Sequence, residues 1–325
     1  MTGWLETLSD AWDELVRIPP VARQFRTRLI STDVSLDILA AIRATDDAPC
    51  LMLQTAPAPD ALFELGGMRL GTVSDNLGLF LVLSLEDSSK RDLFSTICAD
   101  VIAAASAPNS SDSLDQFLAR LDAWRQFLRD RRDGFSRSET IGLIGELLVL
   151  EQVLAVDPHH LDTWRSPNDG LHDFQIDGHA LEVKTSLGPA STITISSLDQ
   201  LDSAGLNRLD LLHVRLIENP DGRSLKDILT AIGDILPHDS FRRAFYNALL
   251  RRGLMPDDLT ARITPKVQQR AIEAYLVSDT FPRLLRSTVP APVADATYRL
   301  EIRAISDHAE ELATVLDAFI EGDHT

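Results

Sequence analysis

The spacing of apolar residues changes along the chain, from helical periods to the alternation typical of strands and back again. The first segment, MTGWLETLSDAWDELV, is acidic and amphipathic and predicts a helix. A segment rich in Ser, Pro, Asn and Asp, 106–113, has the composition of a linker. We therefore expect a separate N-terminal α+β domain over residues 1–108. Between its first helix and the linker, the pattern predicts strands around 34–42, 49–55 and 78–86 and a helix from about Lys90 to Ala105.

Two helices are predicted after the linker. From Leu114 the apolar residues keep the spacing of an amphipathic helix that packs on a core, as far as Asp133-Gly134. A new helix begins at Ser136, because Glu139 stands three residues later and completes a capping box.

The body of this second helix, IGLIGELLVL, is apolar on every side except at Glu146, which indicates a buried helix. An unpaired buried charge is costly, so such a carboxylate is normally paired, protonated or bound to a metal ion. The alternative is a glutamate that reaches solvent or pairs with a distant arginine. Gly142 and Gly145 each cost about 1 kcal/mol relative to alanine inside a helix, which indicates a close approach to a neighbouring strand.

The stretch HDFQIDGHALEVKTS, residues 172–186, predicts a tight hairpin. Asp177-Gly178 lies between two short runs of alternating apolar residues, and both residues tolerate the positive φ of a type I′ turn. This turn fixes the register, so that Asp173 falls opposite Glu182 on the partner strand. The apolar face then carries Phe174, Ile176, Leu181 and Val183, and the polar face carries Asp173, Gln175, Glu182 and Lys184.

Two carboxylates that face each other across a sheet repel, so Asp173 and Glu182 need a cation near them. Lys184, the next residue along the polar face, is one candidate for this charge, and a bound divalent metal ion is another. Only four lysines occur in the chain, at 90, 184, 226 and 266, which favours a specific role for the one at this position. The alternative is an ordinary edge strand with one apolar and one charged face.

The segments after the hairpin continue the pattern of a mixed domain. STITISS, 191–197, predicts a third strand, and Ser197 with Gln200 predicts a second capping box that opens a short helix. DLLHVRLI, 210–217, predicts a buried strand. The order of elements from Ser136 is therefore helix, three strands, helix, strand.

This order predicts an α+β or α/β core with the preceding helix over residues 109–218. The remaining residues, 219–325, predict a mainly helical extension that ends in a closing helix. Two added strands are expected within it, around 274–279 and 296–305.

The net charge of −18 argues against a protein that coats nucleic acid by overall electrostatic attraction, so any contact with DNA must be local. The best local patch is an arginine cluster at the end of the helix that follows the linker. Its alternative interpretation is a solvated helix face. The cluster comprises Arg120, Arg125, Arg129, Arg131, Arg132 and Arg137, of which we take Arg131, Arg132 and Arg137 as candidate substrate contacts.

Cysteine usage and hydropathy indicate a cytoplasmic protein. Cys50 and Cys98 lie far apart without metal-ligand spacing, which indicates buried, reduced thiols and argues against a zinc site. No apolar run approaches the roughly 18 residues needed to cross a bilayer, and the acidic start is unlike a signal peptide. We therefore expect no association with membranes.

Several motifs between residues 141 and 217 resemble a known family. They are GLIGELLVL, TWRSPNDGLHDF, HALEVKTS, ITISSLDQLD and LLHVRL. With the order of elements, they resemble the PD-(D/E)XK restriction-endonuclease-like core. More closely, they resemble the uncharacterised bacterial family of PD-(D/E)XK motif proteins associated with restriction and defence gene clusters.

The resemblance implies a metal site on the hairpin. Asp173 and Glu182 would bind Mg²⁺ with the help of the Val183 carbonyl oxygen, and Mn²⁺ is the expected substitute. Lys184 would orient or deprotonate the attacking water, and Glu146 would be a further ligand or an acid just outside the ligands. Hard oxygen ligands of this kind suit Mg²⁺, which polarises a phosphate and lowers the pKa of bound water.

Other polar residues near these motifs receive different interpretations. The family name expects a proline before the aspartate, where this chain has His172. His172 and His179 fall on the apolar face of the hairpin, so we interpret both as structural. Trp164 is predicted to be a core anchor, and Gln200 a helix cap, with a substrate contact as the alternative role of Gln200.

Two functions follow from the resemblance and the composition. The first is a Mg²⁺-dependent DNA endonuclease of a bacterial restriction or phage-defence system. The chain favours it by keeping all four expected site residues, Glu146, Asp173, Glu182 and Lys184. The second is a non-catalytic interaction subunit that keeps the nuclease fold, which the strong acidity favours. The expected partners are DNA and other proteins of a defence gene cluster, and a homodimer is a further alternative.

Overall fold

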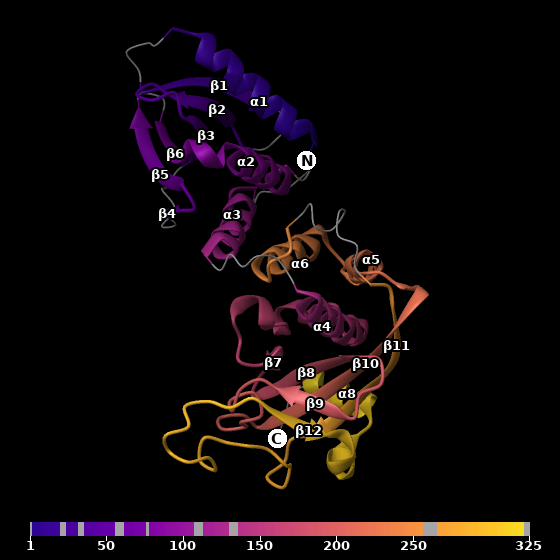
Figure 1. The fold of residues 1–325 in the computed structure, drawn as a ribbon. Coiled ribbons are helices and arrows are strands. Elements are labelled where there is room, and N and C mark those ends of the chain that lie inside the picture. The colour runs from indigo at the N-terminus through magenta and orange to yellow at the C-terminus, as the bar shows by residue number, and fades with distance from the viewer. Residues whose placement is uncertain are drawn as a thin grey trace. The chain divides into compact units, whose positions relative to one another are not determined.

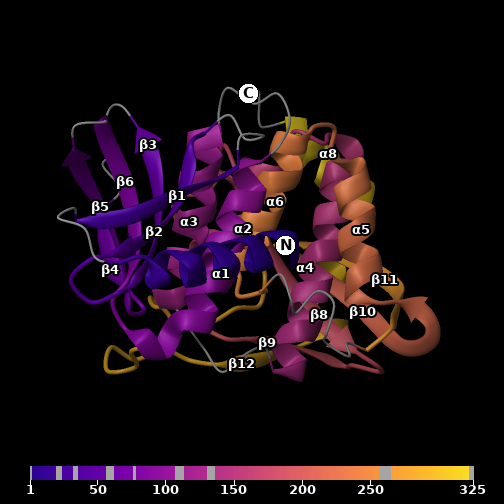
Figure 2. The same cartoon turned by 90° about the horizontal axis from the view of Figure 1, so that it is seen from above.

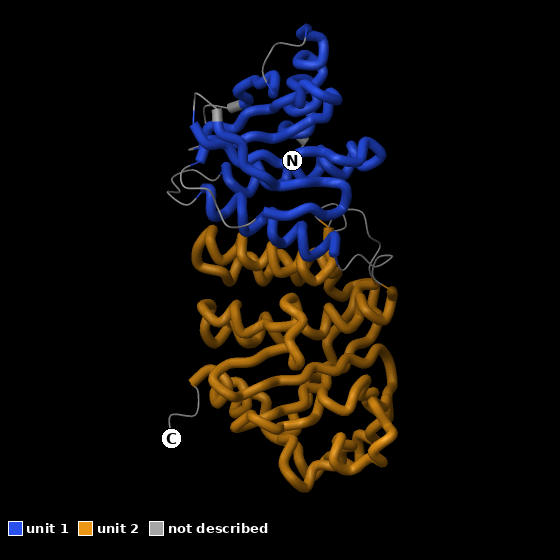
Figure 3. Tube along the Cα trace, turned by 90° about the vertical axis from the view of Figure 1, so that its left-hand side faces the viewer, with its two compact units in different colours: residues 1–131 blue, residues 132–325 orange. Residues whose placement is uncertain are grey.

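The fold is that of a computed structural model, which describes residues 2–19, 24–31, 36–55, 62–75, 78–106, 113–129, 136–255 and 265–321. The chain divides into two compact units, Met1–Arg131 (unit 1) and Arg132–Thr325 (unit 2), shown in Figure 3. Each unit has its own main sheet. Across the described ranges, no helix has both the length and the apolar character needed to traverse a membrane.

Unit 1 is built on an antiparallel sheet of six strands in the order β1-β2-β3-β6-β5-β4 (Figure 1). The three predicted strands correspond to β2, β3 and β6, whereas β1, β4 and β5 were not predicted. Arg26 and Arg28 interrupt the apolar pattern of β1, FRTRLIS. The bounds are β1 Phe25–Ser31, β2 Ile38–Arg43, β3 Pro49–Thr55, β4 Phe63–Leu65, β5 Met68–Asp75 and β6 Gly78–Leu85.

The described part of unit 1 also contains the helices α1 (Thr2–Arg17), α2 (Arg91–Ala105) and α3 (Ser113–Arg129), and a 3-10 turn, Ser88–Lys90, lies before α2. α1 packs on α2 and on β2, and the Trp12 indole N–H donates to the Cys50 carbonyl at 3.0 Å. The predicted helices correspond to these three.

α3 belongs to unit 1, whereas the sequence predicts a domain boundary near residue 108, before this helix. Asp100 of α2 accepts hydrogen bonds from Arg120 Nε at 2.6 Å and from Trp124 Nε1 at 2.7 Å, all three side chains being buried. This shared polar contact holds α3 against α2 in unit 1. Arg120 is therefore an interior residue of unit 1 and not part of a surface arginine patch.

The main sheet of unit 2 has five strands in the order β13-β11-β10-β8-β7. β8 and β10 are parallel, and the other neighbours are antiparallel. The bounds are β7 Phe174–Ile176, β8 His179–Leu187, β10 Arg208–Arg223, β11 Val267–Leu276 and β13 Ala309–Glu310.

Three expectations about unit 2 need correction. The third predicted strand, β9 (Thr192–Ile195), leaves the main sheet and pairs with β12 (Tyr298–Glu301). β11, which lies in the segment predicted as an extension, instead belongs to the main sheet and pairs with β10. No helix follows Ser197, because residues 197–201 form bends and turns.

The helices of unit 2 pack together on one side of its sheet. α4 contacts α5 and α8, and Figure 2 shows α4 and α5 next to each other. Residues of α4, α5, α6 and α8 join one apolar cluster. Ser136 and Glu139 form the predicted capping box at the start of α4, with Ser136 N donating to Glu139 Oε2 at 2.8 Å. The bounds are α4 Arg137–Val156, α5 Leu225–Ile235, α6 Asp239–Arg251 and α8 Leu312–Glu321, and 3-10 turns cover His160–Thr163, Ser166–Asn168 and Ile302–His308.

The five-stranded sheet has two unlike faces. On the helix-covered face, Leu181 and Val183 of β8 join the large core formed with α4, α5, α6 and α8. The opposite face, which we call the polar face, carries Ala180, Glu182, Lys184 and Ser186 of β8. Near Ala180 this face is covered by β9 and β12, whose residues Ile193, Ile195 and Leu300 form a second, smaller core with Leu209, Leu211 and Tyr275.

Candidate functional site

The hairpin has the register that the sequence predicts. Phe174 pairs with Leu181, and Ile176 pairs with His179. Asp177 and Gly178 both have positive φ, 43° and 86°, as a type I′ turn requires. Phe174 and Leu181 lie in the core on the helix-covered face, so Glu182 points to the polar face.

Backbone contacts from the preceding loop fix Asp173 at the entrance to β7. Its carbonyl oxygen accepts hydrogen bonds from the N–H groups of Arg165, at 2.8 Å, and Ser166, at 3.2 Å. Its carboxylate Oδ2 accepts the N–H of Val183 at 2.8 Å. The loop turns sharply at Gly170, where an added Cβ would lie 2.6 Å from the Cβ of Arg165. The motif TWRSPNDGLHDF thus builds the support of Asp173.

The electrostatic environment of Asp173 disfavours its charged form. Burial raises the pKa of its carboxyl well above the ordinary value, and the negative charges of Glu182 and Glu146 raise it further. The Val183 N–H and the Lys184 ammonium oppose this rise without cancelling it. Asp173 therefore lies within the electrostatic reach of both of the other carboxylates predicted for the site.

Lys184 links Glu182 to a loop that follows β9. Its Nζ donates to Glu182 Oε1 at 2.7 Å and to Gln200 Oε1 at 3.0 Å. Gln200 Oε1 also accepts the N–H of Ser196 at 2.8 Å. Gln200 was predicted to be a helix cap. It is instead a neighbour of Lys184 on the polar face.

A segment near the C-terminus holds the loop that carries Gln200. Arg286 forms a two-pronged ion pair with Asp199, both contacts being 2.7 Å long. Asp295 Oδ1 accepts the N–H of Leu198 at 2.9 Å. Residues almost a hundred positions apart thus fix the loop, which explains why its conformation was not predicted.

The two histidines of the hairpin lie in different places. His179 is on the apolar side, as predicted, where its Nε2 lies 2.6 Å from Asp210 Oδ2 and its ring packs edge-on against Phe319. His172 is not on the apolar face. Its Nδ1 lies 3.7 Å from Glu182 Oε2, with both side chains buried, because the chain bends before β7 begins.

Glu146 pairs with an arginine that follows α6. Its Oε1 accepts Arg252 Nη2 at 2.9 Å, and its Oε2 accepts the Trp164 indole N–H at 3.2 Å. Pairing with a distant arginine was the alternative interpretation of this residue. Trp164 is buried, as predicted for a core anchor, and it also donates a hydrogen bond. Arg252 was not predicted as the partner, because the local sequence Arg251-Arg252-Gly253 does not indicate a contact with a residue 106 positions earlier.

The arginines predicted as substrate contacts do not form one described patch. Arg131 and Arg132 lie outside the described residues. Arg137, at the start of α4, is exposed and pairs with Glu218 of β10. Arg125 of α3 pairs with Asp122 at 2.6 Å.

Asp173 and Glu182 have the chemistry to hold a hard divalent cation. Among the side chains of the described ranges, no group of three or more His, Cys, Asp or Glu residues could hold a metal ion. The two carboxylates form a pair, and Val183, whose N–H binds Asp173, adds a backbone carbonyl in the same strand. A cation beside this pair would offset the repulsion that raises the pKa of Asp173, so the donor set fits.

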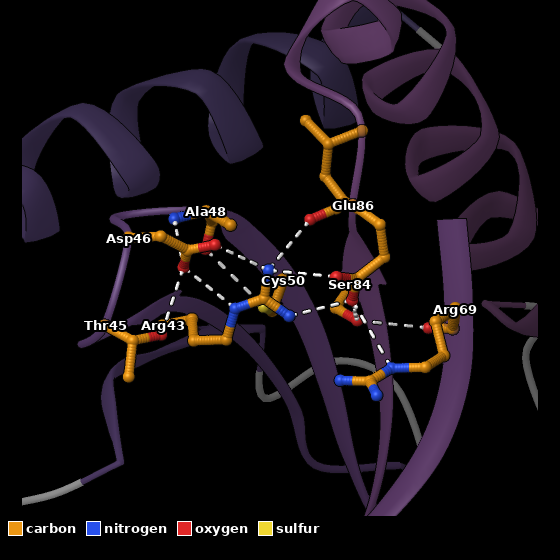
Figure 4. A network of polar contacts seen from close by, with 9 residues as sticks. Arg43, Thr45, Asp46, Ala48, Cys50, Arg69, Ser84 and Glu86 are labelled. Atoms are coloured by element: carbon orange, nitrogen blue, oxygen red, sulfur yellow. Dashed lines mark hydrogen bonds and ion pairs between the residues drawn. The ribbon is translucent and has the colours of Figure 1, made fainter. Parts of the chain in front are cut away.

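A second polar cluster lies in unit 1, and its charged groups pair with one another (Figure 4). Arg43 donates to both oxygens of Asp46, at 2.8 and 2.7 Å, and to Glu86 Oε1 at 2.8 Å. Ser84 Oγ donates to the same Glu86 oxygen at 2.6 Å. Hydrogen bonds from Arg43 lower the pKa values of Asp46 and Glu86, so both carboxylates are ionised and neutralise the guanidinium. This cluster ties β2 to β6 and leaves Arg43 little capacity for a ligand.

Comparisons with known proteins bear on the whole chain. Neither the curated proteins nor the solved structures contain a match to it. Residues 8–303 match the family described as "Putative PD-(D/E)XK family member, (DUF4420)". That description suggests a nuclease-like function, and PD-(D/E)XK proteins usually use divalent metal ions. Because the match spans most of the sequence, from within α1 to the strand β12 and beyond, the protein belongs to the DUF4420 family of PD-(D/E)XK proteins.

Proposed function

We propose that the protein is a Mg²⁺-dependent endonuclease that hydrolyses phosphodiester bonds of DNA in a bacterial restriction or phage-defence system. One observation carries the proposal: the hairpin register brings Asp173, Glu182 and Lys184 to the same region, and burial with like charges raises the pKa of Asp173. Perturbed carboxylates beside a lysine are typical of sites that bind metal ions and perform catalysis. Membership of a PD-(D/E)XK family supports the same reaction.

In this proposal the elements around the hairpin form the nuclease core. α4 supplies the first helix, β7 and β8 the hairpin, and β10 the parallel strand beside it. β9 lies outside the main sheet, so the third strand of the predicted order has a different role here. We take the start of unit 2, Arg132, as the start of the domain that contains this core.

The proposed roles follow from the contacts of each side chain. Asp173, Glu182 and the Val183 carbonyl would hold Mg²⁺ or Mn²⁺, which when bound polarises the scissile phosphate. Lys184 would release Gln200 or Glu182 and orient the attacking water or a phosphate oxygen with its ammonium group. Glu146, anchored by Arg252, would be a further metal ligand or an acid just outside the ligands.

DNA cleavage at low ionic strength tests the proposal, because a chain of net charge −18 binds DNA weakly and salt screens local attraction further. We expect the protein, with partner proteins from its gene cluster if these are required, to cut DNA in Mg²⁺ or Mn²⁺. We expect Lys184→Ala to lower cutting by at least about 100-fold, the size of a positioned acid–base group.

A matched control uses another lysine of unit 2. Lys226 is exposed on α5, so Lys226→Ala removes the same charge without touching the hairpin. The proposal fails if Lys184→Ala cuts as well as Lys226→Ala. It also fails if supercoiled, linear and single-stranded DNA all stay intact in both metals. The protein would then be an interaction subunit that keeps the nuclease fold, the function that its acidity favours.

A further inference from the structure

Three side chains on neighbouring strands of the polar face form a chain of contacts. Ser186 Oγ of β8 lies 2.9 Å from His213 Nε2 of β10. His213 Nδ1 lies 3.3 Å from Glu273 Oε2 of β11. A hydroxyl, an imidazole and a carboxylate in this order are the arrangement that activates a serine nucleophile. Ser186 and His213 lie in the motifs HALEVKTS and LLHVRL, but no motif places them beside Glu273, because the three residues come together only through the strand order.

The partners of Glu273 determine which histidine nitrogen carries the proton. Burial alone would raise the pKa of Glu273, but hydrogen bonds from Arg215 Nη1, at 2.8 Å, and from the Tyr275 hydroxyl, at 3.1 Å, outweigh it and lower the pKa. An ionised Glu273 can only accept a hydrogen bond, so His213 Nδ1 carries the ring proton and donates it to Glu273 Oε2 as a hydrogen bond. Nε2 of the neutral ring is then an acceptor, and the Ser186 hydroxyl must donate to it.

This direction of the hydrogen bond decides what Ser186 can do. With its proton held by His213, Ser186 Oγ presents lone pairs to its surroundings, so it does not donate to a phosphate. Ser186 is partly exposed, whereas His213 is buried beneath it. The hydroxyl is therefore an accessible oxygen with a base behind it, which is the geometry of a nucleophile.

Two cationic residues share the polar face with Ser186. Arg215 is the direct neighbour of Ser186 in the register of β8 and β10, and its side chain is 43% exposed. Lys184 lies two residues before Ser186 and projects from the same face. Arg215 pairs with Glu273 and Lys184 with Glu182, and the side chains of both cationic residues are partly exposed. Cationic groups on the same face favour an electrophile that carries or develops negative charge on its oxygens, as a phosphoric ester does.

We propose that Ser186 is a nucleophile for phosphoric esters, activated by His213 and oriented through Glu273. In the step, Ser186 Oγ forms a bond to phosphorus while its proton moves to His213 Nε2. The bond from phosphorus to the leaving oxygen breaks, and that oxygen takes the proton from His213. The products are a phosphorylated Ser186 and a free alcohol. The step needs neither the carboxylate pair nor a metal ion.

Labelling with diisopropyl fluorophosphate, a phosphoryl fluoride, tests this reaction directly. The full-length protein is incubated with the reagent in EDTA, and intact mass and peptide mapping follow the adduct. The Ser186 oxygen replaces fluoride on phosphorus, so we expect one adduct, at Ser186. Ser186→Ala should abolish it, and His213→Gln should slow it by at least about 100-fold, since general-base assistance contributes at least this much. Ser306→Ala, which removes an exposed serine elsewhere in unit 2, should label like wild type.

The wild-type experiment alone can overturn the proposal, whatever the variants do to folding. Two results would show that the three residues are only a structural hydrogen-bond chain. One is the absence of an adduct at Ser186 in the wild type, and the other is a Ser186→Ala variant that is labelled at other serines as much as the wild type is labelled. Glu273→Gln provides a second variant that keeps the size of the side chain. If it is labelled as fast as the wild type, Glu273 does not orient His213. Because EDTA is present, failure here leaves the metal-dependent cleavage assay unaffected, and the reverse also holds.

Discussion

Asp173 is a residue whose charge opposes folding unless something compensates for it. Its pKa is raised by burial, by Glu182 and by Glu146. A carboxyl with a raised folded-state pKa contributes stability fully below its ordinary pKa of 3.8, and this contribution is lost as the pH rises through the raised value. At neutral pH the ionised group is therefore a cost, which a neutral side chain of the same shape removes.

We expect Asp173→Asn to raise the Tm of the metal-free protein near neutral pH by a few degrees, and to change it little near pH 4. The asparagine oxygen still accepts the Val183 N–H, so the hydrogen bond is kept. Thermal melts in EDTA across this pH range measure the effect. A substitution that lowers Tm near neutral pH would show that the charge is already compensated.

The same substitution predicts the response to metal. A cation that binds the folded state raises Tm by mass action, so we expect Mg²⁺ or Mn²⁺ to stabilise the wild type. Asp173→Asn should lose most of this shift, whereas Asp317→Asn, an exposed position on α8, should keep it. Equal shifts in all three proteins would locate the ion elsewhere.

The two cysteines give a chemical measure of the stability of unit 1. Both are buried; burial raises the pKa of Cys50 to about 12 and that of Cys98 well above its ordinary value. The thiolate is the reactive form, so we expect neither thiol to react with a disulfide reagent in the folded protein at about pH 8, and both to react in denaturant. Rapid reaction of the folded protein would contradict this burial.

At the scale of single residues, the sequence predicts what is fixed locally. Asp177-Gly178 determined the register of the hairpin, and Ser136 with Glu139 determined the start of α4, since each signal lies within a few residues. The partner of Glu146 and the contact of His172 with Glu182 depend on segments brought together by folding. No local pattern encodes such contacts.

At the scale of elements, α4 approaches β8 closely at Gly145. A Cβ on Gly145 would lie 1.8 Å from Thr185 Oγ1, whereas one on Gly142 would meet nothing within 4 Å. We expect Gly145→Ala to lower the free energy of unfolding by about 1–3 kcal/mol through overpacking. Gly142→Ala should raise it by about 0.5–1 kcal/mol through helix propensity. Chemical denaturation of both variants measures the difference.

A second substitution separates the clash from any other effect of the new methyl group. Thr185→Ala removes the hydroxyl but keeps the Cβ, which would still lie 3.0 Å from the added atom. Gly145→Ala should therefore cost less in a Thr185→Ala background than in the wild type. An equal cost in both backgrounds would mean that the close approach lies elsewhere.

The strand order could be predicted only in part. β7, β8 and β10 carried clear patterns, and the apolar run of β10 correctly indicated a strand buried on both faces. β9 is the four-residue strand TITI, and β11 begins with the largely polar residues VQQR, so nothing local shows that β11 rather than β9 pairs with β10. β9 pairs instead with β12, which is distant in sequence.

At the scale of the whole molecule, the two units have separate cores. Both apolar clusters of unit 2 consist of residues between Ile141 and Ile320. We therefore expect the fragment 132–325 to fold without unit 1 and to keep the metal-induced rise in Tm. Near-UV circular dichroism and thermal melts of the fragment check this. A fragment without fixed tertiary packing would show that unit 2 depends on the N-terminal residues.

The sheet order of unit 2 also has a consequence for the synthesis of the chain. α4 is apolar on nearly every side, and its core is completed by Val315, Leu316 and Phe319 of α8, close to the end of the sequence. Domains emerge from the ribosome at about 5–20 residues per second, so α4 waits on the order of ten seconds for its last neighbours. Unit 1, in contrast, is complete once α3 has emerged. Truncations that remove α8 should therefore leave a nascent chain with a folded first unit and an aggregation-prone second one.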